Sequence, residues 1–224
     1  MKKVVAVITI SLIIFVGCSQ EKQEISSQYP SSSSITEEST IAATSSDENT
    51  NNYWDSYVET FSDYNFEGAS EATFDDRHFR MDVLPQNIPE ELVANNYYYD
   101  IAGEFENLSN IYGENEVLKI VARSIRNKFQ EKVYITEYVI KNLSVAKKNE
   151  LKIIKSPMTS SLEEYIEKYN LTEFTIIRVE VSMTYSQEAI NRIPQLDAGT
   201  YVRSFLCGKS NEAKEWKIYE VYWE

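Results

Sequence analysis

The chain has 224 residues, a formal net charge of -13 and an aromatic content of 12%. An acidic protein repels phosphate backbones, so nucleic acids are disfavoured as partners, and so is direct docking on anionic lipid. The length suits one folded domain preceded by a tail.

The start of the chain has the pattern of a secretory signal. Two lysines precede an almost purely apolar run at residues 4–17. A membrane span needs about 20 apolar residues, so this run is short for a span and suits a cleaved signal. The run ends at Phe15-Val16-Gly17-Cys18. This tetrapeptide resembles the lipobox of bacterial lipoprotein signal peptides, although Phe15 stands where that family prefers Leu. A plain cleaved signal and a retained span are the alternatives.

The lipobox resemblance implies that residues 1–17 form the signal peptide and that Cys18 is the lipidated residue. The mature chain would then be a bacterial lipoprotein, anchored by lipid at the extracytoplasmic face of the cell membrane. Two acyl chains anchor stably, because each buried methylene adds about 0.8 kcal/mol. With Cys18 taken by lipid, Cys207 has no second cysteine to pair with, and its strand-like surroundings predict a small buried hydrophobe.

Residues 18–52 are expected to form the lipidated cysteine and a disordered tether. Ser, Thr, Glu, Asn and Gln dominate this segment, which therefore cannot bury enough apolar surface to offset its ordering entropy. Aromatic residues resume at Tyr53, and residues 53–224 are expected to form a single domain.

The first half of that domain is predicted to be helical. Apolar residues between Trp54 and Phe61 suggest a short helix, and residues 68–82 look like a loop. Asn87 can cap a helix that runs to Gly113. A second helix follows over residues 118–129, where apolar residues recur at the helical period.

After residue 131 the apolar period changes from 3.6 to 2, which is typical of strands. The pattern predicts strands at residues 132–146, 151–155, 173–185, 199–207 and 215–223. The first two are expected to form a hairpin around a polar turn at 147–150. Ser160-Ser161-Leu162-Glu163 resembles a capping box that starts a helix, and residues 186–197 are expected to be a connection.

Helices followed by a run of strands predict the α+β class. The order of elements over residues 89–223 resembles the nuclear-transport-factor-two-like superfamily. The segment that resembles its first helix and turn is Asp100-Ile101-Ala102-Gly103-Glu104-Phe105-Glu106-Asn107-Leu108. This resemblance implies N-terminal helices packed on a strongly curved antiparallel sheet, a cone-shaped roll. A cystatin-like roll, with one long helix on a curved sheet, is the alternative.

The sequence contains few signals of catalysis. The single histidine, His78, lies beside two aspartates, but Arg77 intrudes and no second histidine is present to complete a metal site. Phosphate-loop, zinc-protease and nucleophile-elbow motifs are also absent. The sequence therefore predicts no metal and no cofactor, leaves enzymatic activity open, and favours a non-catalytic role.

Four residues are the first candidates for a pocket, and Arg203 and Glu220, on neighbouring predicted strands, could line one as well. Arg178 and Glu180 share one face of the long strand at 173–185, and Tyr138 and Tyr201 lie on other predicted strands. Tyrosine joins a large apolar body to a polar tip, which suits binding surfaces. An ordinary solvated sheet face with weak ion pairs is the alternative for Arg178 and Glu180.

The expected function is a non-catalytic binding or assembly domain presented at the cell envelope. Its partner would be an envelope protein or a second copy of the chain, in addition to the membrane reached through the lipid. The alternative is a small-molecule binder or hydrolase-like enzyme with a pocket inside the curved sheet. A fold of this kind does not choose between these functions.

Overall fold

The computed structural model describes residues 53–153, 157–193 and 197–224. The expected signal peptide, Cys18 and the tether all lie outside the described residues. Residues 154 and 155 of the expected strand at 151–155, and Pro194 in the expected connection, lie outside them as well.

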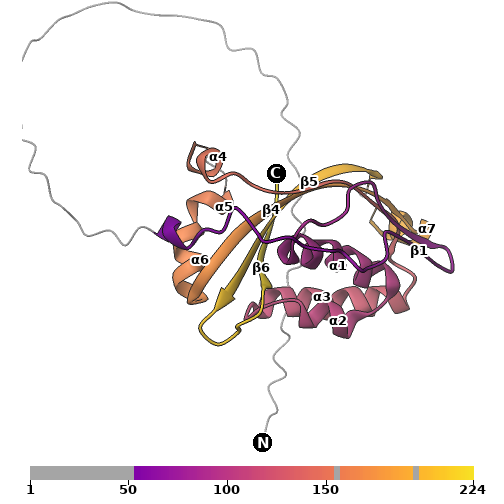
Figure 1. Ribbon diagram of the computed structural model, residues 1–224. Helices are drawn as coiled ribbons and strands as arrows, with labels where there is room; N and C mark the ends of the chain where they lie inside the picture. The colour runs from indigo at the N-terminus through magenta and orange to yellow at the C-terminus, as the bar shows by residue number, and fades with distance from the viewer. Residues whose placement is uncertain (1–52, 154–156, 194–196) are drawn as a thin grey trace, which may run out of the picture. The chain divides into compact units, whose positions relative to one another are not determined.

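The described residues form one mixed, open sheet with helices packed on it, so the α+β class is confirmed (Figure 1). Its strands, in spatial order, are β1 (Glu71–Phe74), β2 (Arg77–Met81), β3 (Ile135–Val145), β4 (Leu171–Tyr185), β5 (Gly199–Ser210) and β6 (Lys217–Trp223). The pair β2/β3 is parallel, whereas the other neighbouring pairs are antiparallel. The expectation of a purely antiparallel sheet was therefore wrong.

The hairpin of β1 and β2 replaces the loop expected at residues 68–82. In β2 the side chains of Arg77, Phe79 and Met81 are buried, and those of His78 and Arg80 are exposed. The alternation is that of a strand, but a charged residue occupies one of the buried positions. The strand could therefore not be predicted from the polarity of its residues, because the burial of Arg77 depends on contacts with residues far along the chain.

The helices between β2 and β3 are α1 (Ile88–Ala102), α2 (Phe105–Asn110) and α3 (Glu116–Gln130). Asn87 caps α1 as expected, because its side chain accepts a hydrogen bond of 2.9 Å from the backbone N–H of Glu90. The expected continuation to Gly113 was wrong. Gly103 adopts a φ of 80°, a left-handed conformation that ends α1 and allows α2 to begin in a new direction. The helix expected over residues 118–129 is confirmed as α3.

The hairpin expected over residues 132–155 was wrong, because α4 (Lys148–Ile153) follows β3 and β3 pairs with β2 and β4. Two more helices, α5 (Pro157–Ser160) and α6 (Leu162–Lys168), lead into β4. Ser161 is the N-cap residue of α6, and its own side chain accepts no capping hydrogen bond. Near the N-terminus, a 3-10 turn at Tyr53–Ser56 replaces the short helix expected as far as Phe61.

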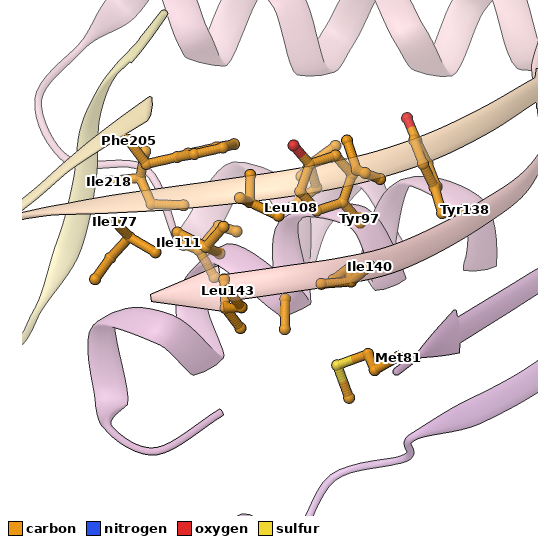
Figure 2. Packing of buried hydrophobic residues seen from close by; sticks show 14 of the residues in the cluster. Met81, Tyr97, Leu108, Ile111, Tyr138, Ile140, Leu143, Ile177, Phe205 and Ile218 are labelled. Atoms are coloured by element: carbon orange, nitrogen blue, oxygen red, sulfur yellow. The ribbon is translucent and has the colours of Figure 1, made fainter. Parts of the chain in front are cut away.

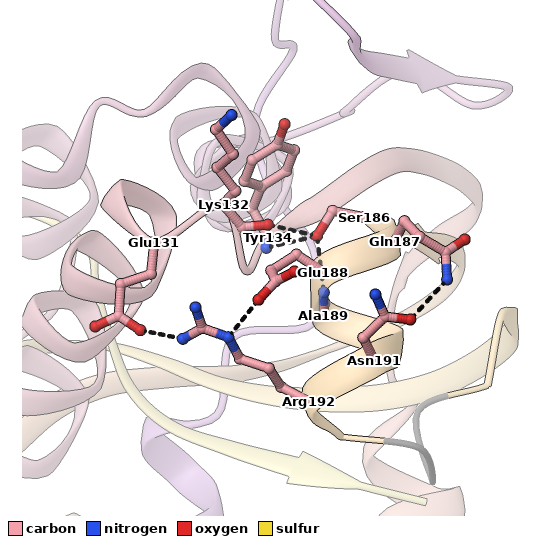
Figure 3. Close-up of polar contacts among 9 residues, drawn as sticks. All are labelled: Glu131, Lys132, Tyr134, Ser186, Gln187, Glu188, Ala189, Asn191 and Arg192. Atoms are coloured by element: carbon pink, nitrogen blue, oxygen red, sulfur yellow. Dashed lines mark hydrogen bonds and ion pairs between the residues drawn. The ribbon is translucent and has the colours of Figure 1, made fainter.

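The connection from β4 to β5 contains a short helix, α7 (Gln187–Arg192), which is fastened to the end of α3 (Figure 3). The Ser186 hydroxyl caps α7 by accepting a hydrogen bond of 3.1 Å from the Ala189 N–H. It also donates a hydrogen bond of 2.7 Å to the carbonyl of Lys132. Arg192 forms ion pairs with Glu188 and, beyond α3, with Glu131. These contacts fix the end of β4 against the segment that enters β3.

Each face of the sheet buries its own apolar cluster, so strands β4 and β5 are covered on both sides. On one face, α1 and α2 pack on a cluster that includes Ile140 and Phe205 (Figure 2). On the other face, α4, α5 and α6 cover Phe174, Ile176 and Leu206. The alternation predicted for residues 173–185 is confirmed, because from residue 173 on the odd-numbered apolar residues of β4 lie on the first face and the even-numbered ones on the second.

Candidate functional site

The four candidate pocket residues lie on opposite faces of the sheet. Arg178 is paired across the ladder with Ser204, on the face covered by α4 to α6, and Glu180 follows on the same face. Tyr138 and Tyr201 are paired with Met183 and Val181, whose side chains lie on the α1 face. The sheet therefore separates the two pairs of candidates, and they do not line one common pocket.

Arg178 borders a small cavity of about 30 Å³. Its guanidinium forms an ion pair with Glu224, which also accepts a hydrogen bond from Ser204. The remaining lining includes apolar side chains such as Leu151 and Ile176. A cavity of this size has room for one or two water molecules, whereas a pocket for an organic ligand is about ten times larger. The cavity therefore suits ordered water beside the Arg178–Glu224 ion pair, where Arg178 Nε is buried without a hydrogen-bond partner among the described residues.

A more distinctive group of side chains lies on the α1 face and is called here the Arg203 cluster. It comprises Tyr97 and Asp100 of α1, Tyr138 of β3, Arg203 of β5 and Trp223 of β6. The Tyr138 hydroxyl donates a hydrogen bond of 2.6 Å to Asp100 Oδ2. The rings of Tyr97 and Tyr138 lie 4.9 Å apart between centroids, in an edge-to-face arrangement. Helix α1 thus brings its polar residues directly over the central strands.

Arg203 packs against an aromatic ring and forms no ion pair with a carboxylate of the described residues. Its guanidinium carbon lies 3.6 Å from the centroid of the Trp223 ring and 5.8 Å from that of Tyr97. The Nε atom is buried and has no hydrogen-bond partner among the described residues. The same is true of the Tyr97 hydroxyl, although the whole Tyr97 side chain is 0% exposed. The Tyr97 hydroxyl nonetheless interacts with Arg203, because the Arg203 side chain favours the charged form of that hydroxyl both through its charge and through hydrogen bonding.

The positive charge of Arg203 affects the titratable groups around it. Burial raises the pKa of Tyr97 to about 12, and the guanidinium acts against this rise. Burial also raises the pKa of Asp100, although the Tyr138 hydroxyl and Arg203 both favour the charged carboxylate. Arg203 likewise opposes the rise in pKa that burial causes at Tyr112, Tyr138 and Tyr185. The cluster therefore holds opposite charges close together without a direct ion pair.

The outer edge of the Arg203 cluster is aromatic and accessible. Trp223 is 51% exposed, and its ring meets that of Tyr201 edge-to-face with centroids 5.5 Å apart. The Tyr201 hydroxyl donates a hydrogen bond of 2.7 Å to the carbonyl of Asp197. Of the candidates named from the sequence, Tyr138, Tyr201 and Arg203 thus lie at this cluster.

Asp100, Arg203 and Tyr97 were not joined by reasoning from the sequence. The spacing of Tyr97 and Asp100 could have placed both on neighbouring parts of a helix surface, because residues three apart are neighbours there. Nothing in that spacing indicates that Arg203, about 100 residues later in the chain, lies beneath them. The docking of α1 on the sheet creates the juxtaposition.

The histidine and the described cysteine, the other residues with reactive side chains considered from the sequence, do not form part of this cluster. His78 is exposed on β2 and its ring contacts the Thr73 hydroxyl at 3.2 Å. Cys207 is 0% exposed, which confirms that it is a small buried hydrophobe, and burial raises the pKa of its thiol. Within residues 53–153, 157–193 and 197–224, no group of three or more His, Cys, Asp or Glu side chains is arranged to hold a metal ion.

Across the part of the chain that the structure describes, no helix combines the length and the hydrophobicity needed to cross a bilayer. No protein-family model, curated protein or solved structure matches this chain.

Proposed function

We propose that this chain is a lipid-anchored bacterial protein at the extracytoplasmic face of the cell membrane, and that its folded domain is a non-catalytic binding or assembly module. The lipobox-like segment that ends at Cys18 supports the anchor. The observation that carries the assembly role is an apolar stripe on α3 that no described element covers. The stripe consists of Val117, Ile120 and Val121.

The apolar surface of helix α3 extends further around the helix than the part that the rest of the domain buries. Ala122 is buried against the core, with Leu118 and Ile125 packed beside it. Val117 and Ile120 are nevertheless 66% and 55% exposed, and Val121 is 43% exposed. These three positions are spaced i, i+3 and i+4, so they form one continuous strip. A contiguous exposed apolar strip on a soluble domain is typical of a protein interface.

The interior beneath the helices supports an assembly role over an enzyme with a deep pocket. Tyr97, Ile101, Leu108, Ile140 and Phe205 fill the space between α1, α2 and the sheet, and each is at most 1% exposed. Interiors packed in this way leave no room for a ligand of ordinary size.

The fold that we propose in finer detail is the cone-shaped roll of the nuclear-transport-factor-two-like superfamily. Its support is a layer of helices on one face of long strands that are antiparallel from β3 to β6, in which α1 lies on the strands and α2 and α3 pack beside it. A cystatin-like roll would place one long helix there. A crystal structure of the chain would distinguish these folds through the curvature of β3, β4 and β5, since a nearly flat sheet is incompatible with the cone.

Replacing Cys18 with alanine is expected to abolish lipidation, because the thiol sulfur is the atom to which the lipid would be attached. Cells that express the parent chain should incorporate radiolabelled palmitate into it, and the protein should sediment with membranes. The Cys18→Ala chain should carry no label and leave the membrane fraction. Cys207→Ala is the matched control, because Cys207 is the other cysteine of the chain and should leave the labelling unchanged. Continued labelling of Cys18→Ala would refute the anchor.

The α3 stripe is expected to contact another protein in the native membrane. A photo-crosslinking amino acid placed at Ile120 should give a defined crosslinked product on irradiation of intact cells. The same amino acid at Ile190 of α7, which is 40% exposed but lies outside the stripe, should give none. The mass of the product distinguishes a second copy from an envelope partner, and either result supports assembly. Irradiation that leaves the Ile120 chain uncrosslinked, or crosslinks both positions equally, contradicts the proposal.

A further inference from the structure

Helix α3 differs in charge from the protein that carries it. It contains four basic residues and one acidic residue, which give the helix a formal net charge of +3, whereas the whole chain has a formal net charge of -13. The basic residues are Lys119, Arg123, Arg126 and Lys128. A local excess of positive charge on an acidic protein attracts negatively charged partners that the average charge would repel.

The basic residues border the apolar stripe of Val117, Ile120 and Val121. Ile120, Arg123 and Arg126 follow one another at intervals of three residues, so their side chains are neighbours along the helix surface. Arg123 and Arg126 are both exposed, as Ile120 is. An apolar centre with charged residues at its rim is typical of a protein interface. The stripe and the basic residues therefore form one continuous surface.

Contacts within the domain leave most of this positive charge uncompensated. Glu116 is the acidic residue of α3, and its carboxylate lies 3.4 Å from the Lys119 ammonium group and 4.0 Å from the Arg123 guanidinium. The Glu116 side chain is 71% exposed, and ion pairs in solvent are weak. Arg126 and Lys128 form no ion pair with any residue that the structure describes. The surface thus presents cationic groups to whatever covers the stripe.

We propose that the partner of the α3 stripe is an acidic segment of another envelope protein, whose aliphatic side chains pack on the stripe and whose carboxylates pair with Arg123 and Arg126. This inference rests on the assembly role proposed above and specifies the chemistry of the partner. Guanidinium groups pair closely with carboxylates, and complementary charges at the rim of an interface select the partner and speed association.

Two other occupants of the stripe fit these charges less well. A second copy docked through the same helix would set two helices of charge +3 against each other, and like charges across an interface disfavour association. Helices that lie in a membrane surface carry Trp, Phe or Leu on the apolar face, whereas the stripe consists of valine and isoleucine. Anionic lipid would also repel the remainder of this acidic chain.

The test uses the full chain with the photo-crosslinking amino acid at Ile120, irradiated in intact cells. Reversal of two charges, Arg123→Glu together with Arg126→Glu, should lower the yield of the crosslinked product at least about tenfold, because carboxylates would then face carboxylates. Lys141→Glu together with Lys214→Glu is the matched control. It changes the net charge equally at exposed positions outside α3 and should leave the yield unchanged. Equal yields from the charge-reversed chain and the parent would overturn the inference.

A second pair of substitutions separates charge from folding. Arg123→Gln together with Arg126→Gln removes both charges, and glutamine suits an exposed helix, so the circular dichroism spectrum should match that of the parent. The crosslinking yield should be intermediate. In isolated membranes, raising NaCl from about 0.1 M to about 1 M shortens the Debye length from about 10 Å to about 3 Å and should also lower the yield of the parent chain. A yield that responds to neither change contradicts an acidic partner.

The identity of the crosslinked product completes the test. Mass spectrometry of the partner peptide should show an excess of Asp and Glu around the crosslinked residue. A product that joins two copies of this chain, or one that carries a phospholipid, would overturn the inference of an acidic protein partner. Failure of the Ile120 chain to crosslink at all would overturn the assembly role as well, whereas a protein product that is insensitive to charge overturns this inference alone.

Discussion

Replacement of Phe205 by alanine is expected to lower the free energy of unfolding by about 3–5 kcal/mol. Phe205 is 0% exposed and lies on β5, between Ile177 of β4 and Val221 of β6 in the ladder. Its ring also meets that of Tyr97 on α1, with centroids 6.0 Å apart. Truncation therefore leaves a cavity at the interface between the helices and the sheet, where tight packing limits collapse of the surroundings.

Urea denaturation followed by circular dichroism would measure this effect on the full chain. Ile153→Ala is the control, since Ile153 is 81% exposed and its truncation should change stability by no more than about 0.5 kcal/mol. Natural domains are stable by about 5–15 kcal/mol, so the Phe205 variant should lose a large share of its stability. A loss below about 1 kcal/mol would mean that the α1 face is loosely packed, contrary to the structure.

Replacement of Arg77 by alanine should be the second most damaging change, with a cost of about 3 kcal/mol. Arg77 is 7% exposed, and its guanidinium donates to the carbonyl of Ile101 at the C-terminal end of α1. The guanidinium also lies 4.5 Å from the centroid of the Phe129 ring on α3. One side chain thus joins β2, α1 and α3, and it supplies positive charge where the helix dipole is negative.

Arg80 provides a matched control for this experiment, because it lies on the same strand but is exposed. Its ion pair with Asp82, at 3.4 Å, lies in solvent, where such pairs contribute at most about 1 kcal/mol. Arg80→Ala should therefore be nearly neutral in the same urea titration. Arg77→Lys should be intermediate, since it keeps the charge and loses the planar contact with Phe129. Equal effects of Arg77→Ala and Arg80→Ala would show that burial of Arg77 adds no stability.

The secondary-structure elements that were predicted wrongly have one reason in common. Residues 151–153 of the strand expected at 151–155 belong to α4 instead, because a short apolar run fits either period and the surroundings decide between them. The break at Gly103 was missed because apolar residues continue at helical spacing on both sides of it. In each case the local pattern was ambiguous, and packing with distant segments resolved it.

The sequence by itself determined the α+β class, helix α3 and the long strands β3 to β6, because the periods of 3.6 and 2 are local properties of the chain. It also determined which residues of β4 face each side, since alternation along a strand leaves no other choice. Only the tertiary structure decided that Arg77 is buried, that Arg178 and Tyr138 lie on opposite faces, and that Asp100 lies above Arg203. These relations depend on strand order and on the docking of α1, which join residues far apart in sequence through contacts that no local pattern records.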